Sequence, residues 1–112
     1  MRIYVTGAIR MYGVADAEEE FKKMFDRLKE IGCTDVCSPL EIVKSDLPSE
    51  QEKRFEMINS CDMVLFRRDW KNDVMSQKEF LYIAKSRPDI SLMYDSWGDW
   101  AHLRNLVRFS CS

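Results

Sequence analysis

The sequence predicts an α/β domain built on a small, doubly wound parallel sheet of four to five strands with helices on both faces. Short apolar segments alternate along the chain with longer amphipathic ones, in the order β-α-β-α-β-α-β-α. One apolar run, residues 63–66, is continuous, as in a central strand covered on both faces. Right-handed crossovers place such strands in one parallel sheet. The length of 112 residues fits a single domain, residues 1–112.

The first strand and the first helix have the clearest signals. Residues 2–6 are predicted as a strand that ends at Gly7. Residues 15–31 are predicted as an amphipathic helix, because apolar side chains recur there at intervals of three and four. Gly32 follows the last apolar position, where helices commonly end.

The remaining elements follow from apolar runs and cap signals. A capping box at residues 49–52 opens the second long helix, and the strand at 63–66 follows it. The other expected segments, in chain order, are a short strand at 34–37, a polar connection at 40–48, a polar loop at 67–73, a helix at 76–86, a strand at 89–94 and a last helix capped by Ser96 and Asp99.

Composition excludes several classes of function. A net charge of -2 argues against a broad surface for duplex nucleic acid or an anionic membrane. No apolar window is long enough to span a bilayer, and the amino terminus lacks a signal-peptide profile, so we expect a cytoplasmic protein. The four cysteines and the single His102 do not have the spacing of a zinc site. We therefore expect reduced thiols, no metal and no cofactor.

The loop after the first strand is a candidate anion site. Ligands of open parallel sheets bind outside the carboxyl ends of the strands, where the loop at residues 7–13 lies. Gly7 and Ala8 allow close approach of the backbone, whose amides can hold an anion, and Arg10 adds a positive charge. The alternative is a plain tight turn between a strand and a helix.

Glu79 is the candidate carboxylate at the same edge of the sheet. It can act as a nucleophile or a base. However, Ser76-x-x-Glu79 also matches a capping box, and the pattern alone favours that structural role. Tyr4 and Trp70 are open to two interpretations as well, since each can contact a ligand or belong to the core.

Three segments resemble a known enzyme family. They are Ile3-Tyr4-Val5-Thr6-Gly7-Ala8-Ile9-Arg10, then Ser60-Cys61-Asp62-Met63-Val64-Leu65, then Trp70 followed nine residues later by Glu79. Together they resemble the nucleoside 2-deoxyribosyltransferase superfamily. The greatest similarity is to its small deoxynucleoside 5'-monophosphate N-glycosidases and related phage and bacterial domains. The resemblance covers residues 2–94.

This resemblance implies a flavodoxin- or Rossmann-like fold and cleavage or transfer at the N-glycosidic bond of a 2'-deoxynucleoside or its 5'-monophosphate. It implies that Glu79 is the nucleophile and that Tyr4 lies near the reacting sugar. The substrate-binding positions it implies are Gly7, Ala8, Ile9, Arg10 and Trp70. The expected partners are a small deoxynucleoside or deoxynucleotide and further copies of the chain, in a homodimer or larger homo-oligomer.

The sequence departs from the family at two places. Arg54 stands where many members have an aspartate, and Met75-Ser76 replaces a Gly-Ala or Gly-Thr pair. Asp69 or Asp73 is a candidate replacement for the missing acid. These departures keep a second hypothesis open, a catalytically degenerate nucleotide-binding or protein-interaction module of the same fold. The base, the need for a 5'-phosphate and the acceptor of the sugar are also left open.

Overall fold

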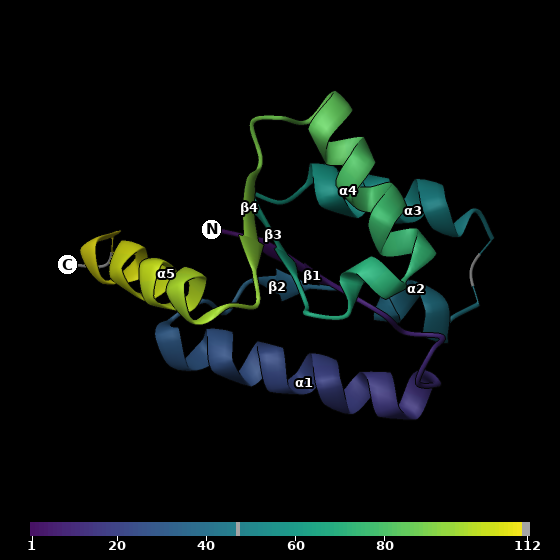
Figure 1. Cartoon of the computed structure of the whole chain (residues 1–112), viewed down its shortest axis with the longest axis horizontal. Helices are drawn as coiled ribbons and strands as arrows, with labels where there is room; N and C mark the ends of the chain where they lie inside the picture. Colours follow the sequence, from purple (N-terminus) through teal and green to yellow (C-terminus); the bar gives the residue numbers. More distant parts are fainter. Residues whose placement is uncertain (47, 111–112) are drawn as a thin grey trace.

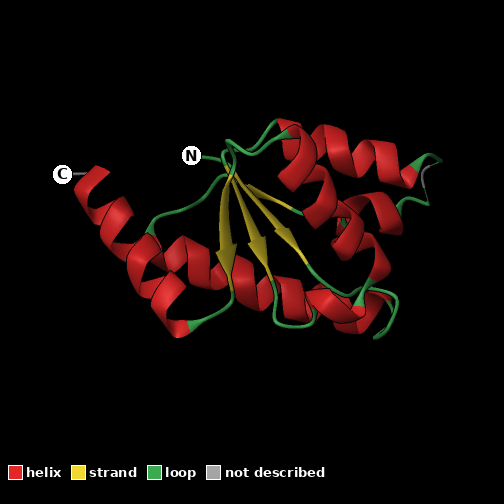
Figure 2. Cartoon of the chain, turned by 45° about the horizontal axis from the view of Figure 1, so that its top comes forward, coloured by secondary structure: helices red, strands yellow, loops and turns green. Residues whose placement is uncertain are grey.

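A computed structural model describes residues 1–46 and 48–110 of the chain. In this part of the chain four parallel strands form one sheet in the order β2-β1-β3-β4. The strand arrows run in the same direction, and helices pack on both sides of the sheet (Figures 1 and 2). The predicted fold class, a doubly wound parallel α/β sheet of flavodoxin-like topology, is therefore confirmed.

The strands are short and their registers are regular. β1 pairs with β2 through Tyr4 and Cys37, and with β3 through Tyr4 and Val64. β3 pairs with β4 through Val64 and Leu92. The four strands are β1 (Ile3–Thr6), β2 (Val36–Cys37), β3 (Met63–Phe66) and β4 (Ser91–Tyr94).

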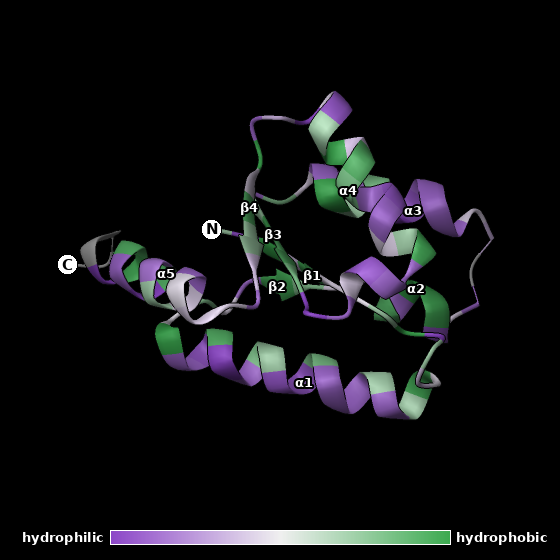
Figure 3. Ribbon diagram, viewed as in Figure 1, coloured by the Kyte–Doolittle hydropathy of each residue, from purple (hydrophilic) through white to green (hydrophobic). Residues whose placement is uncertain are grey.

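The helices are divided between the two faces of the sheet. Residues of α1 and α5 share one hydrophobic cluster, and residues of α3 and α4 share the other (Figure 1). Hydrophobic residues of α1 lie along its edge toward the sheet (Figure 3). The helices are α1 (Val14–Ile31), α2 (Leu40–Lys44), α3 (Glu50–Asn59), α4 (Val74–Ser86) and α5 (Trp97–Ser110), with a 3-10 turn η1 (Trp70–Asn72) before α4.

Strand alternation assigns the side chains of β1 to two environments. Ile3 and Val5 belong to the cluster beneath α1 and α5. Tyr4 belongs to the cluster beneath α3 and α4, and Thr6 follows it on the same face because side chains alternate along a strand. The polar side chains of β1 therefore meet the helices that carry Arg54 and Glu79.

Two local predictions were wrong. The polar connection expected at 40–48 contains the helix α2, because Leu40 and Ile42 bury their side chains. The capping box at 49–52 does not form. Ser49 has a left-handed backbone (φ 58°, ψ 46°) and its side chain makes no cap bond, whereas a capping serine has an extended backbone.

Two predictions of where helices begin or end are confirmed. Gly32 ends α1 in the left-handed conformation, with φ of 113°, as its position predicted. Ser96 caps α5, since its Oγ accepts the Asp99 N–H at 3.3 Å. Cys111, the fourth cysteine, lies outside the described residues.

Candidate functional site

The candidate site lies where the order of the strands reverses. The chain passes from β1 to β2 on one side and from β3 to β4 on the other, so β1 and β3 flank the switch point. α1 follows β1 on one face and α4 follows β3 on the opposite face. Ligands of such sheets bind at this position, outside the carboxyl ends of the strands.

The carboxylate of Glu79 is held by two hydroxyl groups of β1. Thr6 Oγ1 donates a hydrogen bond to Glu79 Oε1 at 2.6 Å. The Tyr4 hydroxyl donates a short hydrogen bond to Glu79 Oε2. All three side chains have no exposed surface. The structure thus brings together the two residues predicted to be catalytic, Tyr4 and Glu79.

A line of alternating charges connects this carboxylate to the surface. Arg54 Nη1 lies 3.2 Å from Glu79 Oε1, and Arg54 Nε lies 3.1 Å from Glu50 Oε2. Glu50 also forms a two-bond pair with Arg10, whose Nη1 donates to Glu50 Oε2 at 3.2 Å. Side-chain exposure falls along this line from 62% at Arg10 through 19% at Glu50 to 1% at Arg54 and 0% at Glu79.

Burial and charge act in opposite directions on Glu79. Burial raises the pKa of Glu79 above its ordinary value, because the charged form loses its hydration. Arg54, Thr6 and Tyr4 favour the charged form, and so they lower the pKa of Glu79 in part. Burial and the nearby Glu79 charge raise the pKa of Tyr4 well above its ordinary value. Tyr4 therefore keeps its proton and remains a hydrogen-bond donor.

The capping role considered for Glu79 is wrong. α4 begins at Val74, and Asp73 is its N-cap. Asp73 Oδ2 accepts the Ser76 N–H at 2.9 Å and the Ser76 hydroxyl at 2.7 Å. Since the helix begins earlier than predicted, Glu79 lies in its second turn, beyond the reach of the cap, and contacts β1 instead.

The loop after β1 is closed by side chains of the loop after β3. The Ala8 N–H, a predicted anion ligand, donates to Asp69 Oδ1 at 3.0 Å. Arg67 donates to the Ala8 carbonyl at 3.4 Å and lies 3.3 Å from Asp69 Oδ2. Gly7 packs so closely here that an added Cβ would lie 2.7 Å from Asp69 Oδ1 and 2.8 Å from Arg67 Cβ. The Ala8 amide that was predicted to bind an anion therefore already donates to the carboxylate of Asp69.

The other predicted binding residues lie apart from Glu79. Ile9 is buried in the cluster beneath α1 and α5. Trp70 packs on Phe66 and Phe80, with ring centroids 5.0 and 5.1 Å away, beside a groove of about 630 Å³ at the ends of β3 and β4. Arg10 joins the site through Glu50.

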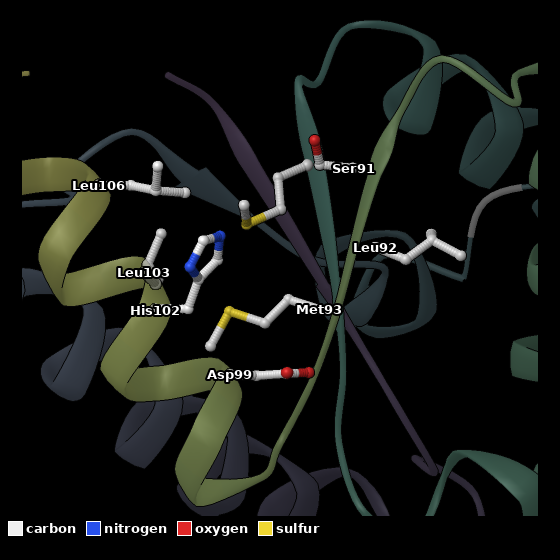
Figure 4. A pocket seen from close by; sticks show the side chains of 8 residues that line it. Ser91, Leu92, Met93, Asp99, His102, Leu103 and Leu106 are labelled. Atoms are coloured by element: carbon white, nitrogen blue, oxygen red, sulfur yellow. The ribbon is translucent and has the colours of Figure 1, made fainter.

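A separate hollow lies on the other face of the sheet. Figure 4 shows Met93, His102 and Leu103 around this space, which has about 300 Å³ and lies between β4 and α5. Three of its apolar lining residues, Met63, Met93 and Leu103, belong to the cluster opposite Tyr4. It is therefore distinct from the space around Glu79.

Sequence reasoning missed Thr6 and Arg67. Strand alternation could have found Thr6, because residues two apart in a strand share a face and Tyr4 was already a candidate. Arg67 is buried against the Phe21 ring, 5.2 Å from its centroid, and pairs with Glu20 at 3.3 Å. No local pattern marks it, since it opens a segment that reads as a polar loop.

The fold and the site define a class: a parallel α/β domain with a buried, hydrogen-bonded glutamate at its topological switch point. The chain belongs to the family described as domain of unknown function (DUF4406), whose profile matches residues 1–92. Neither a curated protein nor a solved structure matches the chain significantly. The family match includes every residue of the buried Glu79 cluster and ends before α5.

The described residues form neither a metal centre nor a membrane span. Within residues 1–46 and 48–110, no three histidine, cysteine or acidic side chains lie together as a metal site would require. Among the helices described, none combines the length and the apolar character needed to cross a membrane.

Proposed function

We propose that this protein cleaves or transfers at the N-glycosidic bond of a 2'-deoxynucleoside or its 5'-monophosphate, with Glu79 as nucleophile. The observation that carries the proposal is the Glu79 carboxylate, which Tyr4 and Thr6 orient at the switch point of the sheet. This is the pair of residues that the resemblance to the nucleoside 2-deoxyribosyltransferases implies for nucleophile and sugar contact.

The chemistry suits a carboxylate held in this way. As the base leaves, positive charge develops on the sugar, and a nearby carboxylate stabilises that charge and then bonds to the anomeric carbon. Water or a second base then takes the sugar from Glu79. The hydroxyls of Tyr4 and Thr6 hold the carboxylate in place before attack, which lowers the entropic part of the barrier.

Substrate entry requires a local opening of the protein. Glu79 has no exposed surface, and both of its oxygens accept hydrogen bonds. The outermost contact of its charged network is the Arg10–Glu50 pair, which lies partly in solvent. A 5'-phosphate competes with Glu50 for Arg10, since guanidinium groups bind phosphate and carboxylate alike. We therefore expect the opening to begin at this pair.

A second candidate function is nucleotide binding without turnover, and Arg54 is the observation that favours it. Its guanidinium lies 3.2 Å from Glu79 Oε1, close to where positive charge would develop on the sugar. Like charges repel, so this cation raises the barrier to bond cleavage. Asp69 and Asp73, the candidate acids, both already accept hydrogen bonds from the chain.

The test is chromatography of the protein incubated with a panel of deoxynucleosides and their monophosphates. We expect free base from the wild type, none from Glu79→Gln, and an unchanged rate from Glu56→Gln, whose side chain is exposed on α3. Circular dichroism checks that both variants fold. Base release that persists in Glu79→Gln contradicts the proposal.

The same panel separates the two candidates by thermal denaturation. If nucleotides raise the melting temperature and no base is released, the protein binds without turnover. The release of base by wild type supports the glycosidase or transferase. The identity of the released base names the substrate, and a 2'-deoxyribosyl product on an added second base separates transfer from hydrolysis.

A further inference from the structure

Two reduced cysteines touch in the interior, beside the Glu79 cluster but outside it. Cys37 ends β2, and Cys61 lies in the turn between α3 and β3. Their Sγ atoms are 3.4 Å apart, and each residue is 4% exposed. The two residues are 24 positions apart in the sequence. The segment between them carries α2 and α3.

The two thiols are not equivalent. The contact with Cys37 lowers the pKa of Cys61 to about 7; burial raises this pKa, and the nearby Ser60 hydroxyl and Arg2 lower it. Ser60 Oγ lies 3.9 Å from Cys61 Sγ and accepts a hydrogen bond from Arg2 Nη1 at 2.7 Å. The same contact and burial raise the pKa of Cys37. We take Cys61 as the attacking thiol, because the Arg2 cation and Ser60 lie beside it and a thiolate is the reactive form.

We propose that Cys37 and Cys61 are a redox modification site, which a peroxide converts to a reversible intramolecular disulfide. The Cys61 thiolate attacks one peroxide oxygen, the O–O bond breaks, and the leaving hydroxide takes a proton to become water. Cys61 is then a sulfenic acid. The Cys37 sulfur attacks the Cys61 sulfur, the S–S bond forms, the S–O bond breaks, and hydroxide leaves with the Cys37 proton as a second water. Two thiols lose two electrons, and the peroxide gains them.

The required movement is small. A disulfide has an S–S distance of about 2 Å, so the sulfurs must approach by about 1.4 Å. Cys37 lies on an edge strand of two residues and Cys61 in a turn, where the backbone adjusts more easily than in a central strand. The cross-link would fix α3, which carries Glu50 and Arg54, to the edge of the sheet. This inference does not rest on the proposed enzyme activity.

The test uses the full chain with Cys33→Ala and Cys111→Ser, so that Cys37 and Cys61 are its only thiols. The folded protein is treated with hydrogen peroxide, then denatured in the presence of the alkylating reagent and weighed by intact mass spectrometry. We expect a monomer that has lost two hydrogen atoms and takes no alkyl label, and we expect dithiothreitol to restore both labels. Further replacement of Cys37 by alanine should leave Cys61 as a sulfenic acid, which dimedone traps.

Ordinary core packing predicts a different result, because buried thiols also behave as small apolar groups. In that case both thiols stay reduced in the folded protein and take label only after denaturation. A disulfide that forms only between two chains, or no faster in the folded protein than in urea, also overturns the proposal. The oxidised monomer should melt at a temperature higher by about 5 °C or more, because the cross-link restricts the unfolded chain.

Discussion

Arg54 and Glu79 are opposite charges withdrawn from water, 3.2 Å apart and almost without exposed surface. Burying both groups costs much of what their attraction returns, so the pair contributes little net stability compared with an apolar pair of equal size. Removing one partner is different, since it leaves the other charge buried without compensation. Glu50 lies 3.1 Å from Arg54 Nε, so it balances the charge of Arg54 but not that of Glu79.

This asymmetry gives a double-mutant prediction. Arg54→Met should lower the free energy of unfolding by about 3–5 kcal/mol, because Glu79 remains buried without its cation. Glu79→Gln should cost less, because Arg54 keeps Glu50. The double variant should lose about 1–3 kcal/mol less than the two singles together, as measured by urea denaturation. Losses that add to within about 0.5 kcal/mol would show that the two charges do not interact.

The raised pKa of Glu79 predicts how stability depends on pH. The folded protein holds the Glu79 proton to a higher pH than the unfolded chain does. Between the two pKa values the folded state binds more protons, so the contribution of Glu79 to stability falls as pH rises through this window. Glu79→Gln has no proton to lose. The stability of wild type minus that of Glu79→Gln should therefore decrease from about pH 4.5 upward and level off above the folded pKa.

Urea titrations at several pH values measure this difference. Groups that titrate alike in both proteins cancel in the subtraction. Glu56→Gln is the matched control, because it makes the same chemical change at an exposed position of α3. A difference that increases with pH would mean that Arg54, Tyr4 and Thr6 outweigh burial and hold the pKa of Glu79 below its ordinary value.

At the scale of elements, β1 meets the loop after β3 through Gly7. A methyl group at this position would lie 2.7 Å from Asp69 Oδ1 and 2.8 Å from Arg67 Cβ. Asp69 can turn away, but Arg67 Cβ moves only with its backbone. Gly7→Ala should therefore lower the free energy of unfolding by about 1–3 kcal/mol through overpacking.

Gly98→Ala is the control for this substitution. A Cβ at Gly98 meets nothing within 4 Å, and the residue lies in the first turn of α5. Alanine favours a helix by up to about 1 kcal/mol over glycine, so this variant should be neutral or slightly stabilised. Chemical denaturation of both variants measures the contrast. If Gly7→Ala and Gly98→Ala were equally stable, the loop after β3 would move enough to accommodate the methyl group at residue 7.

The elements that the sequence predicted well are those with local signals. The apolar spacing of α1 and Gly32 lie within one segment, and the structure agrees with both. Glu79 is different, because its partners Tyr4 and Thr6 are 75 and 73 residues away. Long-range contacts of this kind produce no periodic pattern in the sequence. Ser49 failed as a cap because its backbone is left-handed, a conformation that the local sequence pattern does not reveal.

At the scale of the whole molecule, the sheet separates two hydrophobic cores, and one of them adjoins the candidate site. The core beneath α3 and α4 adjoins the Glu79 cluster, whereas the core beneath α1 and α5 lies on the opposite face and packs against Arg67 through Phe21. The family match ends at residue 92, so α5 lies outside it. Trp100 and Leu103 of α5 are nevertheless buried in the second core. We therefore expect α5 to be needed for the stability of the domain.

The two tryptophans of α5 test this expectation. Trp100 is 2% exposed, donates its ring N–H to Asp95 Oδ1 at 2.7 Å, and lies under the Arg27 guanidinium at 4.1 Å. Trp100→Ala should cost about 3–5 kcal/mol, because it leaves a cavity in the core. Trp97 is 83% exposed, so Trp97→Ala should change stability by less than about 0.5 kcal/mol. Urea denaturation followed by far-ultraviolet circular dichroism measures both. If the two variants were equally stable, α5 would be an appendage of the sheet, and the matched region alone would hold the fold.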